Sequence, residues 1–247
     1  MCLTRTRREE SDAAMIFYGL QKMTLLDYPG FVACTLFTGG CNLRCPFCHN
    51  ADLVTGFDES FPNSSIPEEE ILSFLNKRRG LLDGVCITGG EPLLWKELPA
   101  FLEKVKGLSF SVKLDTNGTF PERLEAVLSA GLADSVAMDL KNCREKYALT
   151  SGIPGLDLSG IERSISLLRS SSVDYEFRTT VVAEYHTPED IAAVADWVAG
   201  AKRYRLQSFT DSGRTLAPGL HAHPKEVLEE MLALARRRIP DTELRGV

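Results

Sequence analysis

The stretch Thr38-Gly-Gly-Cys41-Asn-Leu-Arg-Cys45-Pro-Phe-Cys48-His-Asn50 decides how the rest of the sequence is interpreted. It sets three cysteines at the spacing C-x3-C-x2-C in one short loop that contains glycine and proline. Three thiolates this close can hold three irons of a cubane cluster, whereas a [4Fe–4S] cluster usually takes four cysteine ligands. The pattern therefore predicts a cluster with one iron left open to an outside ligand.

Three other interpretations of the same cysteines stay open. Cys45-Pro-Phe-Cys48-His49 also fits the attachment pattern of c-type haem, but that chemistry requires export, and no apolar segment follows the N-terminal arginines. A zinc site of Cys41, Cys45, Cys48 and His49 would need two adjacent residues to bind one tetrahedral ion. A disulfide framework is more typical of shorter secreted chains.

The composition is that of an ordinary globular protein. The 247 residues are 44% hydrophobic and 25% charged, with a formal net charge of −6. This mild acidity gives no support for nucleic-acid or membrane attraction, so we expect neither partner. Seven cysteines, an odd number, fit a reducing cytoplasm better than a set of disulfides.

The domain organisation is predicted from where apolar periodicity begins. Residues 1–14 are polar and charged without an apolar period, and we expect a disordered tail there. Met15 opens the first strand-like run and is a hypothetical alternative start. Without an internal repeat or a low-complexity linker, we expect residues 15–247 to form a single domain.

Apolar strand-like runs alternate with helical patterns along this domain. Expected strands are Met15–Leu20, Phe31–Thr38, Gly84–Thr88, Ser109–Leu114, Ser135–Leu140, Tyr175–Val182 and Tyr204–Phe209. Expected helices are Pro67–Arg79, Lys96–Lys106, Pro121–Ala130, Leu158–Ser170, Pro188–Ala199 and Pro224–Arg238. Such alternation predicts an α/β fold with a parallel sheet and right-handed crossovers. About six strand–helix units favour an incomplete (β/α) barrel over a doubly wound sheet.

The unusual residues follow the ends of these strands. The cysteine loop, Gly89-Gly90-Glu91-Pro92 and Asp115-Thr-Asn-Gly118 each come after an expected strand, and Asp139 and Lys141 end another. Because active sites of parallel α/β folds gather at the carboxyl ends of strands, these motifs should converge on one face.

Taken together, the cysteine spacing and Thr88-Gly-Gly-Glu-Pro92 resemble those of the radical S-adenosylmethionine (SAM) enzymes. Asp27-Tyr-Pro-Gly30, Cys48-His-Asn50, Leu114-Asp-Thr-Asn-Gly118 and Met138-Asp-Leu-Lys141 resemble motifs of one subgroup, the glycyl-radical-enzyme activating enzymes. The match is nearest to the small activating proteins of anaerobic ribonucleoside-triphosphate reductase. The resemblance covers roughly residues 15–210 and implies a partial (β/α)6 TIM-like barrel of the radical SAM type.

This resemblance implies roles for particular residues. Cys41, Cys45 and Cys48 would be the metal ligands of one [4Fe–4S] cluster, and SAM would complete the open iron. Residues 49–85 contain no cysteine, so a second cluster is not expected. SAM would be bound by Phe47, Gly89, Gly90, Glu91, Asp115, Thr116, Asp139, Lys141 and Arg178. For Asp139 and Lys141, a simple surface ion pair is the alternative. His186, His221 and His223 lack ligand spacing, and we interpret them as exposed loop histidines.

The resemblance also implies an activity. Flavodoxin or ferredoxin would reduce the cluster, SAM would split to methionine and a 5′-deoxyadenosyl radical, and that radical would take a hydrogen atom from a glycine of a partner enzyme. The expected partner is anaerobic ribonucleotide reductase. Two alternatives stay open. One is a radical SAM enzyme acting on a small molecule, similar to 7-carboxy-7-deazaguanine synthase. The other is a non-catalytic iron–sulfur or zinc-binding module.

Overall fold

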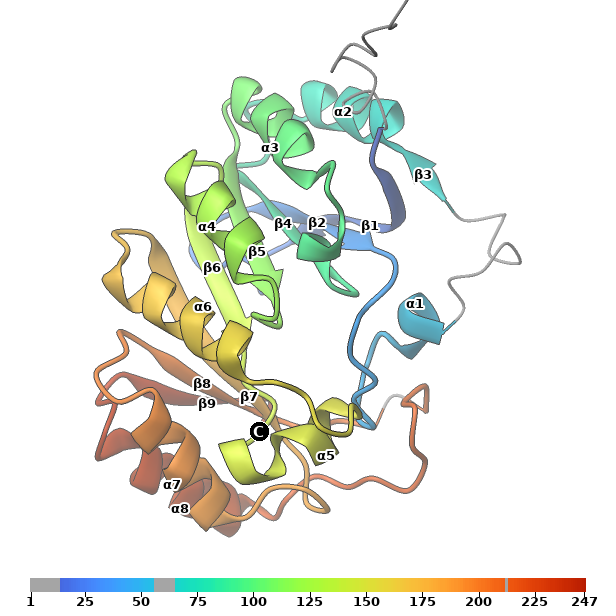
Figure 1. The fold of residues 1–247 in the computed structure, drawn as a ribbon. Coiled ribbons are helices and arrows are strands. Elements are labelled where there is room, and N and C mark those ends of the chain that lie inside the picture. The colour runs from blue at the N-terminus through green and yellow to red at the C-terminus, as the bar shows by residue number, and fades with distance from the viewer. Residues whose placement is uncertain (1–13, 56–64, 212) are drawn as a thin grey trace, which may run out of the picture.

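A computed structural model describes residues 14–55, 65–211 and 213–247 of the chain. The predicted disordered tail lies, apart from Ala14, outside the described residues. Within these ranges the strands form one nine-stranded sheet in the order β3-β1-β2-β4-β5-β6-β7-β8-β9 (Figure 1). The strands are β1 (Ile16–Thr24), β2 (Ala33–Thr38), β3 (Ile66–Pro67), β4 (Gly84–Gly89), β5 (Ser111–Thr116), β6 (Ser135–Asp139), β7 (Asp174–Val181), β8 (Tyr204–Ser208) and β9 (Thr242–Arg245).

Eight α-helices accompany the sheet in the described ranges, and the longer ones lie on its outer side (Figure 1). They are α1 (Ala51–Thr55), α2 (Glu68–Lys77), α3 (Leu98–Gly107), α4 (Pro121–Ser129), α5 (Tyr147–Ser151), α6 (Ser159–Ser170), α7 (Pro188–Trp197) and α8 (Lys225–Arg236). All neighbours from β2 to β9 pair in parallel. The described sheet runs from β3 to β9 without closing, so the predicted partial (β/α)6 barrel is confirmed.

Continuous apolar runs form the parallel strands because both faces of those strands are covered. Val85, Cys86 and Ile87 of β4 are each fully buried, as expected for a strand between helices and a barrel interior. Proline stands at the first position of α4 and α7, where its missing N–H has no helical partner to lose. Thr187 and Asp190 add a capping box to α7. These prolines and capping residues therefore determine where α4 and α7 begin.

Several strands differ from the expectation. β3 was not predicted, because it contains Pro67, which was expected to begin the next helix. β9 was not predicted, because four residues with a single apolar side chain give no strand signal. It pairs with β8, and Arg245 forms a bidentate ion pair with Glu176 of β7, at 3.1 and 3.0 Å between nitrogen and carboxylate oxygens. β5 begins at Ser111 rather than at Ser109, whose φ of +70° is incompatible with a strand.

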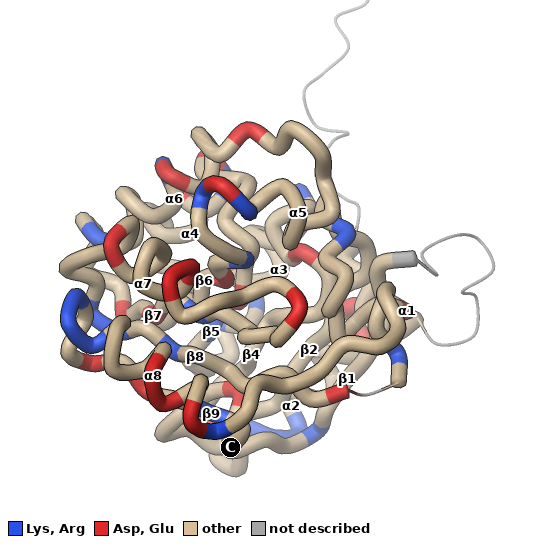
Figure 2. Tube along the Cα trace, turned by 90° about the horizontal axis from the view of Figure 1, so that it is seen from below, with Lys and Arg blue, Asp and Glu red and all other residues tan. Residues whose placement is uncertain are grey.

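The charged residues are mixed in sign on the face that Figure 2 shows. Lysine and arginine segments alternate with aspartate and glutamate segments around helices α6 to α8. In the described part of the chain, no helix is both long and apolar enough to span a bilayer.

Candidate active site

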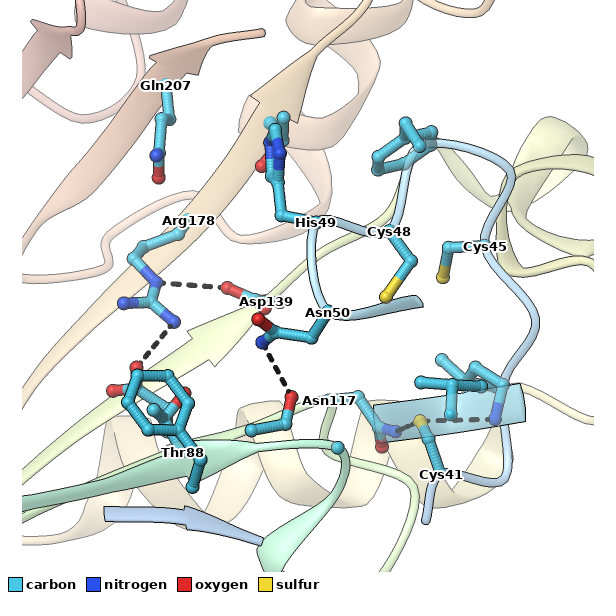
Figure 3. Close-up of a pocket in the computed structure, with 18 of the residues that line it drawn as sticks. Cys41, Cys45, Cys48, His49, Asn50, Thr88, Asn117, Asp139, Arg178 and Gln207 are labelled. Atoms are coloured by element: carbon cyan, nitrogen blue, oxygen red, sulfur yellow. Dashed lines mark hydrogen bonds and ion pairs between the residues drawn. The ribbon is translucent and has the colours of Figure 1, made fainter. Parts of the chain in front are cut away.

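The cysteine loop leaves the carboxyl end of β2 and is held in place by backbone hydrogen bonds. The Gly40 N–H donates to the Leu53 carbonyl at 2.8 Å, and the Arg44 N–H donates to the Ser151 carbonyl of α5 at 2.8 Å. From this loop, the side chains of Cys41, Cys45 and Cys48 point into one shared space (Figure 3). The loop is therefore braced from both sides of the barrel mouth before any ligand is bound.

Gly89 and Gly90 are needed because two backbone segments touch at this point. The Gly90 N–H donates to the Thr38 carbonyl at 2.9 Å, and the Glu91 N–H donates to the Gly40 carbonyl at 2.8 Å. A Cβ atom on Gly90 would lie 1.9 Å from the Gly40 oxygen, and Gly89 has a φ of +113°. The glycine pair therefore joins the end of β4 to the cysteine loop, in addition to bordering the cavity.

An apolar layer covers the cysteines. Leu43, Cys45 and Phe47 pack in a second hydrophobic cluster with Val182 after β7 and with Phe209 and Leu220 after β8. The Ala217 N–H donates to the Pro46 carbonyl at 2.9 Å, which ties the segment after β8 to the loop. Burial raises the pKa of all three thiols, that of Cys45 to about 11. Binding of a metal cluster here must therefore release protons.

The thiols border one end of a cavity of about 450 Å³ inside the barrel. This volume is within the range of about 300–1,000 Å³ usual for small-molecule sites. Of the candidate site residues, all except Glu91 line it. Those lining residues are Cys41, Cys45, Phe47, Cys48, Gly89, Gly90, Asp115, Thr116, Asp139, Lys141 and Arg178. Gln207, Asn50 and Asn117 also border the cavity (Figure 3).

A network of alternating charges crosses the cavity floor. The Arg178 guanidinium contacts Asp115 through Nη2–Oδ2 at 3.1 Å and Asp139 through Nε–Oδ1 at 2.9 Å. Lys141 Nζ lies 3.1 Å from the other oxygen of Asp139, and the buried Lys113 pairs with Asp115. Burial alone would raise the pKa of Asp139, but Arg178 and Lys141 outweigh it and lower this pKa to about 2. The cavity thus offers fixed ionised groups of both signs to a charged ligand.

Glu91 was expected among the residues that bind the ligand, but its carboxylate is hydrogen-bonded within the protein and does not line the cavity. Glu91 is fully buried beside the cavity. Its Oε1 accepts from the Leu93 N–H at 3.0 Å and the Thr116 hydroxyl at 2.8 Å, and its Oε2 accepts from the Asn117 N–H at 2.7 Å. Burial raises the pKa of Glu91 to about 7, although these donors lower it. Glu91 therefore ties the end of β4 to the end of β5.

His186 corrects the expectation of an exposed loop histidine. Its ring is fully buried and contacts Phe47 edge-on, with ring centroids 5.8 Å apart. The Nε2–H donates to the Lys141 carbonyl at 2.8 Å, while Nδ1 accepts from the Val182 N–H at 3.1 Å. Because each ring nitrogen has a backbone partner, His186 braces the segment that carries Lys141. His221, by contrast, is exposed as expected.

His49 does not join the thiols. Its ring stacks on Phe209 with centroids 5.5 Å apart, and Figure 3 shows it directed away from the sulfur of Cys48. Within the described ranges, no three Cys, His, Asp or Glu side chains close on a single-ion site. The zinc site of three cysteines and His49 is therefore not formed in this arrangement.

Comparisons with known proteins place this geometry in a family. The profile of the Radical SAM superfamily matches residues 35–198, which span the cysteine loop and the strands from β2 to β7. The chain belongs to the radical SAM superfamily. Members of this superfamily use a [4Fe–4S] cluster and S-adenosylmethionine, so these are the cofactors of the protein.

Individual relatives carry names that give different activities. A protein of Methanocaldococcus jannaschii, named provisionally as a glycyl-radical enzyme activating enzyme, is 32% identical over 195 residues, covering 77% of this chain and 78% of its own. The 7-carboxy-7-deazaguanine synthase of Thermococcus kodakarensis is 30% identical over 161 residues, covering 59% of this chain and 62% of its own. Streptococcus suis SuiB bound to its precursor peptide superposes with a TM-score of 0.67 at 15% identity, covering 86% of this chain and 48% of SuiB.

The residues present fit the two cofactors. Three thiols that share one space, that of Cys45 buried and those of Cys41 and Cys48 partly buried, supply soft sulfur ligands for a cluster. The adjoining cavity supplies carboxylates and two cations for a ligand that carries an ammonium and a carboxylate. Asn117 and His186 were missed as site residues, because an asparagine–glycine pair is typical of a turn and an isolated histidine has no pattern.

We predict that Gly90→Ala destabilises the protein. The added methyl would meet the Gly40 carbonyl oxygen, and overpacking of this kind costs about 1–3 kcal/mol. Urea denaturation measures the change in the free energy of unfolding. The matched control is Gly107→Ala in α3, where a Cβ atom meets nothing within 4 Å and alanine should stabilise the helix by about 0.5–1 kcal/mol. Equal stability of the two variants would contradict the proposed backbone junction.

Glu91→Gln should destabilise the fold by about 1–3 kcal/mol, because the amide would turn a donor toward the N–H of Asn117 or Leu93. Unfolding by urea at a pH of about 8 measures this loss. Glu103→Gln, an exposed change of the same chemistry on α3, should be neutral. A Glu91→Gln protein as stable as the wild type would show that the three hydrogen bonds are dispensable.

His186 should make stability depend on pH. Burial lowers the pKa of His186 below its usual value of 6.5, so the unfolded chain binds this proton more readily. Its contribution is present above a pH of about 6.5 and is lost as the pH falls below that value. His186→Asn should flatten this dependence in urea unfolding measured from a pH of about 8 to about 5, and the exposed His221→Asn should not. Parallel curves for the wild type and His186→Asn would refute the assignment.

Proposed function

We propose that the protein is a glycyl-radical-enzyme activating enzyme that acts on a protein partner, anaerobic ribonucleoside-triphosphate reductase. The main support is the cavity, whose volume of about 450 Å³ is near the lower end of the range for small-molecule sites. With SAM bound, little room is left for a second small molecule. A hydrogen donor presented from outside, on a slender backbone segment, suits this space better. The coverage shared with the Methanocaldococcus jannaschii protein supports the same subgroup.

In this proposal, different residues of the cavity bind the cluster and the separate parts of SAM. Cys41, Cys45 and Cys48 would hold the cluster and leave one iron open for SAM. The backbone at Gly89 and Gly90 faces the amino group, and Phe47 packs near the adenine. Asp115, Thr116, Asp139, Lys141 and Arg178 lie toward the ribose and carboxylate. The carboxylate of Glu91 holds the ends of β4 and β5 together beside the cavity and does not contact the ligand.

When bound, the cluster supplies the electron for reductive cleavage of SAM, which generates the radical that abstracts hydrogen. The chain itself provides position and charge. Arg178, Lys113 and Lys141 surround the side chains of Asp115 and Asp139, so charged groups of both signs would face the sulfonium and carboxylate of SAM. The apolar layer over the cysteines limits the access of water and of stray hydrogen donors.

The electron donor in this proposal is flavodoxin or ferredoxin, and the compartment is the cytoplasm. An odd total of seven cysteines fits a reducing compartment better than a set of disulfides. Oxygen sensitivity of a cluster and of a glycyl radical would restrict the activity to low-oxygen conditions.

The second candidate is a radical SAM enzyme acting on a small molecule. It is favoured by the 30% identity to the 7-carboxy-7-deazaguanine synthase of Thermococcus kodakarensis. That match covers 59% of this chain, against 77% for the activating-enzyme relative, so the activating role is preferred. A non-catalytic metal-binding module would not need the charged cavity floor.

Anaerobic reconstitution with iron and sulfide, followed by reduction, should give a protein that forms 5′-deoxyadenosine from SAM. Cys45→Ala removes a cluster ligand and should lower this rate by more than about 100-fold, beyond the usual loss from outer-shell changes. Cys143→Ser, a buried cysteine outside the loop, is the control that should keep the activity. Full activity and an intact cluster spectrum in Cys45→Ala would contradict the ligand assignment.

Incubation of the reconstituted protein with SAM, reductant and anaerobic ribonucleotide reductase should produce the doublet of a glycyl radical in the EPR spectrum of the reductase. A reductase variant with alanine at the radical glycine is the control. If 5′-deoxyadenosine forms but no doublet arises on any glycyl-radical enzyme tested, the small-molecule candidate replaces this proposal. If no 5′-deoxyadenosine forms at all, the enzyme function fails.

A further inference from the structure

We infer that Asn117 tunes the reduction potential of the cluster through a hydrogen bond to the sulfur of Cys41. The inference rests on the ligation by three cysteines that the proposed function also uses, and it is independent of the partner. Asn117 follows β5 and comes from a different part of the chain than the cysteine loop. Its Nδ2 lies 3.8 Å from Cys41 Sγ, within range of a hydrogen bond to sulfur (Figure 3).

The orientation of the Asn117 amide is fixed by its other partners. Its Oδ1 accepts from the Thr119 N–H at 3.0 Å and from the Thr119 hydroxyl at 2.6 Å. A backbone N–H can only donate, so the oxygen of the amide must face Thr119 and the NH2 group must face Cys41. The second hydrogen of Nδ2 goes to Asn42 Oδ1 at 2.9 Å. Each polar atom of this side chain therefore has a partner, and rotation of the amide would break several bonds.

The backbone of Asn117 is held as firmly as its side chain. Asn117 is 5% exposed, and its N–H donates to the buried carboxylate of Glu91 at 2.7 Å. Asn42 closes the network by donating from Nδ2 to the Thr119 hydroxyl at 2.8 Å. The donor that faces Cys41 is consequently preorganised and needs no rearrangement when the redox state of a bound cluster changes.

The position also gives the bond an electrostatic effect. The Leu43 N–H lies 3.4 Å from Cys41 Sγ, so this sulfur accepts from two donors. Reduction adds negative charge to a cluster and its sulfurs, and N–H donors stabilise that charge. Hydrogen bonds to the sulfurs are among the features that set the potential of Fe–S clusters. Asn117 should therefore raise the potential and ease the difficult one-electron reduction.

Asn50 offers a matched control. It too is an asparagine that borders the cavity, but its Nδ2 donates to the Gly89 carbonyl at 2.9 Å rather than to a thiol. Asn50→Ala therefore loosens the junction between the cysteine loop and β4 while leaving the donors to Cys41 in place. A loss of rigidity alone would affect both variants, whereas a loss of the N–H···S bond affects only Asn117→Ala.

The experiment is a redox titration of the reconstituted protein under anaerobic conditions, followed by EPR of the reduced cluster. At a given applied potential, Asn117→Ala should lower the ratio of reduced to oxidised cluster about tenfold, which equals a shift of about 59 mV for one electron. Asn50→Ala should stay close to the wild type. An unchanged ratio in Asn117→Ala, or an equal shift in Asn50→Ala, overturns the inference.

Thr119→Val provides a second test if Asn117→Ala does not take up a cluster. It removes the hydroxyl that orients the Asn117 amide but leaves the Thr119 N–H and the donor itself in place. A smaller shift in the same direction supports the inference, and no shift overturns it. The titration needs neither SAM nor a partner protein, so its failure and the failure of the proposed function are distinguishable.

Discussion

The contact on which the site depends is the junction of two backbone segments, residues 38–40 at the end of β2 and residues 89–91 at the end of β4. Two N–H···O bonds join them, and the Gly40 carbonyl lies where any side chain at position 90 would be. β2 and β4 are adjacent parallel strands, so their carboxyl ends emerge side by side. The two hydrogen bonds of this junction therefore fix the position of the cysteine loop relative to the floor of the cavity.

The charged floor depends on the same principle. Asp115 is the penultimate residue of β5, Asp139 ends β6, and Arg178 lies on β7 in register with Asp139. Each would be costly to bury alone, and together they neutralise one another. Because the charges of these side chains are balanced by other protein groups, their positions are fixed before a ligand binds. A zwitterionic ligand can exchange its own charges for these without exposing an unpaired one.

The last third of the chain completes the site. Phe209 and Leu220 cover the cysteine loop, and β9 extends the sheet through Arg245 and its ion pair with Glu176. Sequence patterns did not predict these roles. The segment between β8 and α8 has no regular period, and β9 is recognisable as a strand only from its pairing with β8.

The order of strands and helices, the thiol spacing and the clustering of polar residues at strand ends could be predicted from the sequence. These features depend on local periodicity and on a topology rule that applies to all parallel sheets. The direction of individual side chains could not be predicted. Glu91 turns into the protein, His186 is buried behind Lys141, and Asn117 faces Cys41, because their partners lie 25 to 76 residues away in the chain. Only the packed structure brings such partners together, and so only the tertiary structure decided which residues face the ligand and which support those that do.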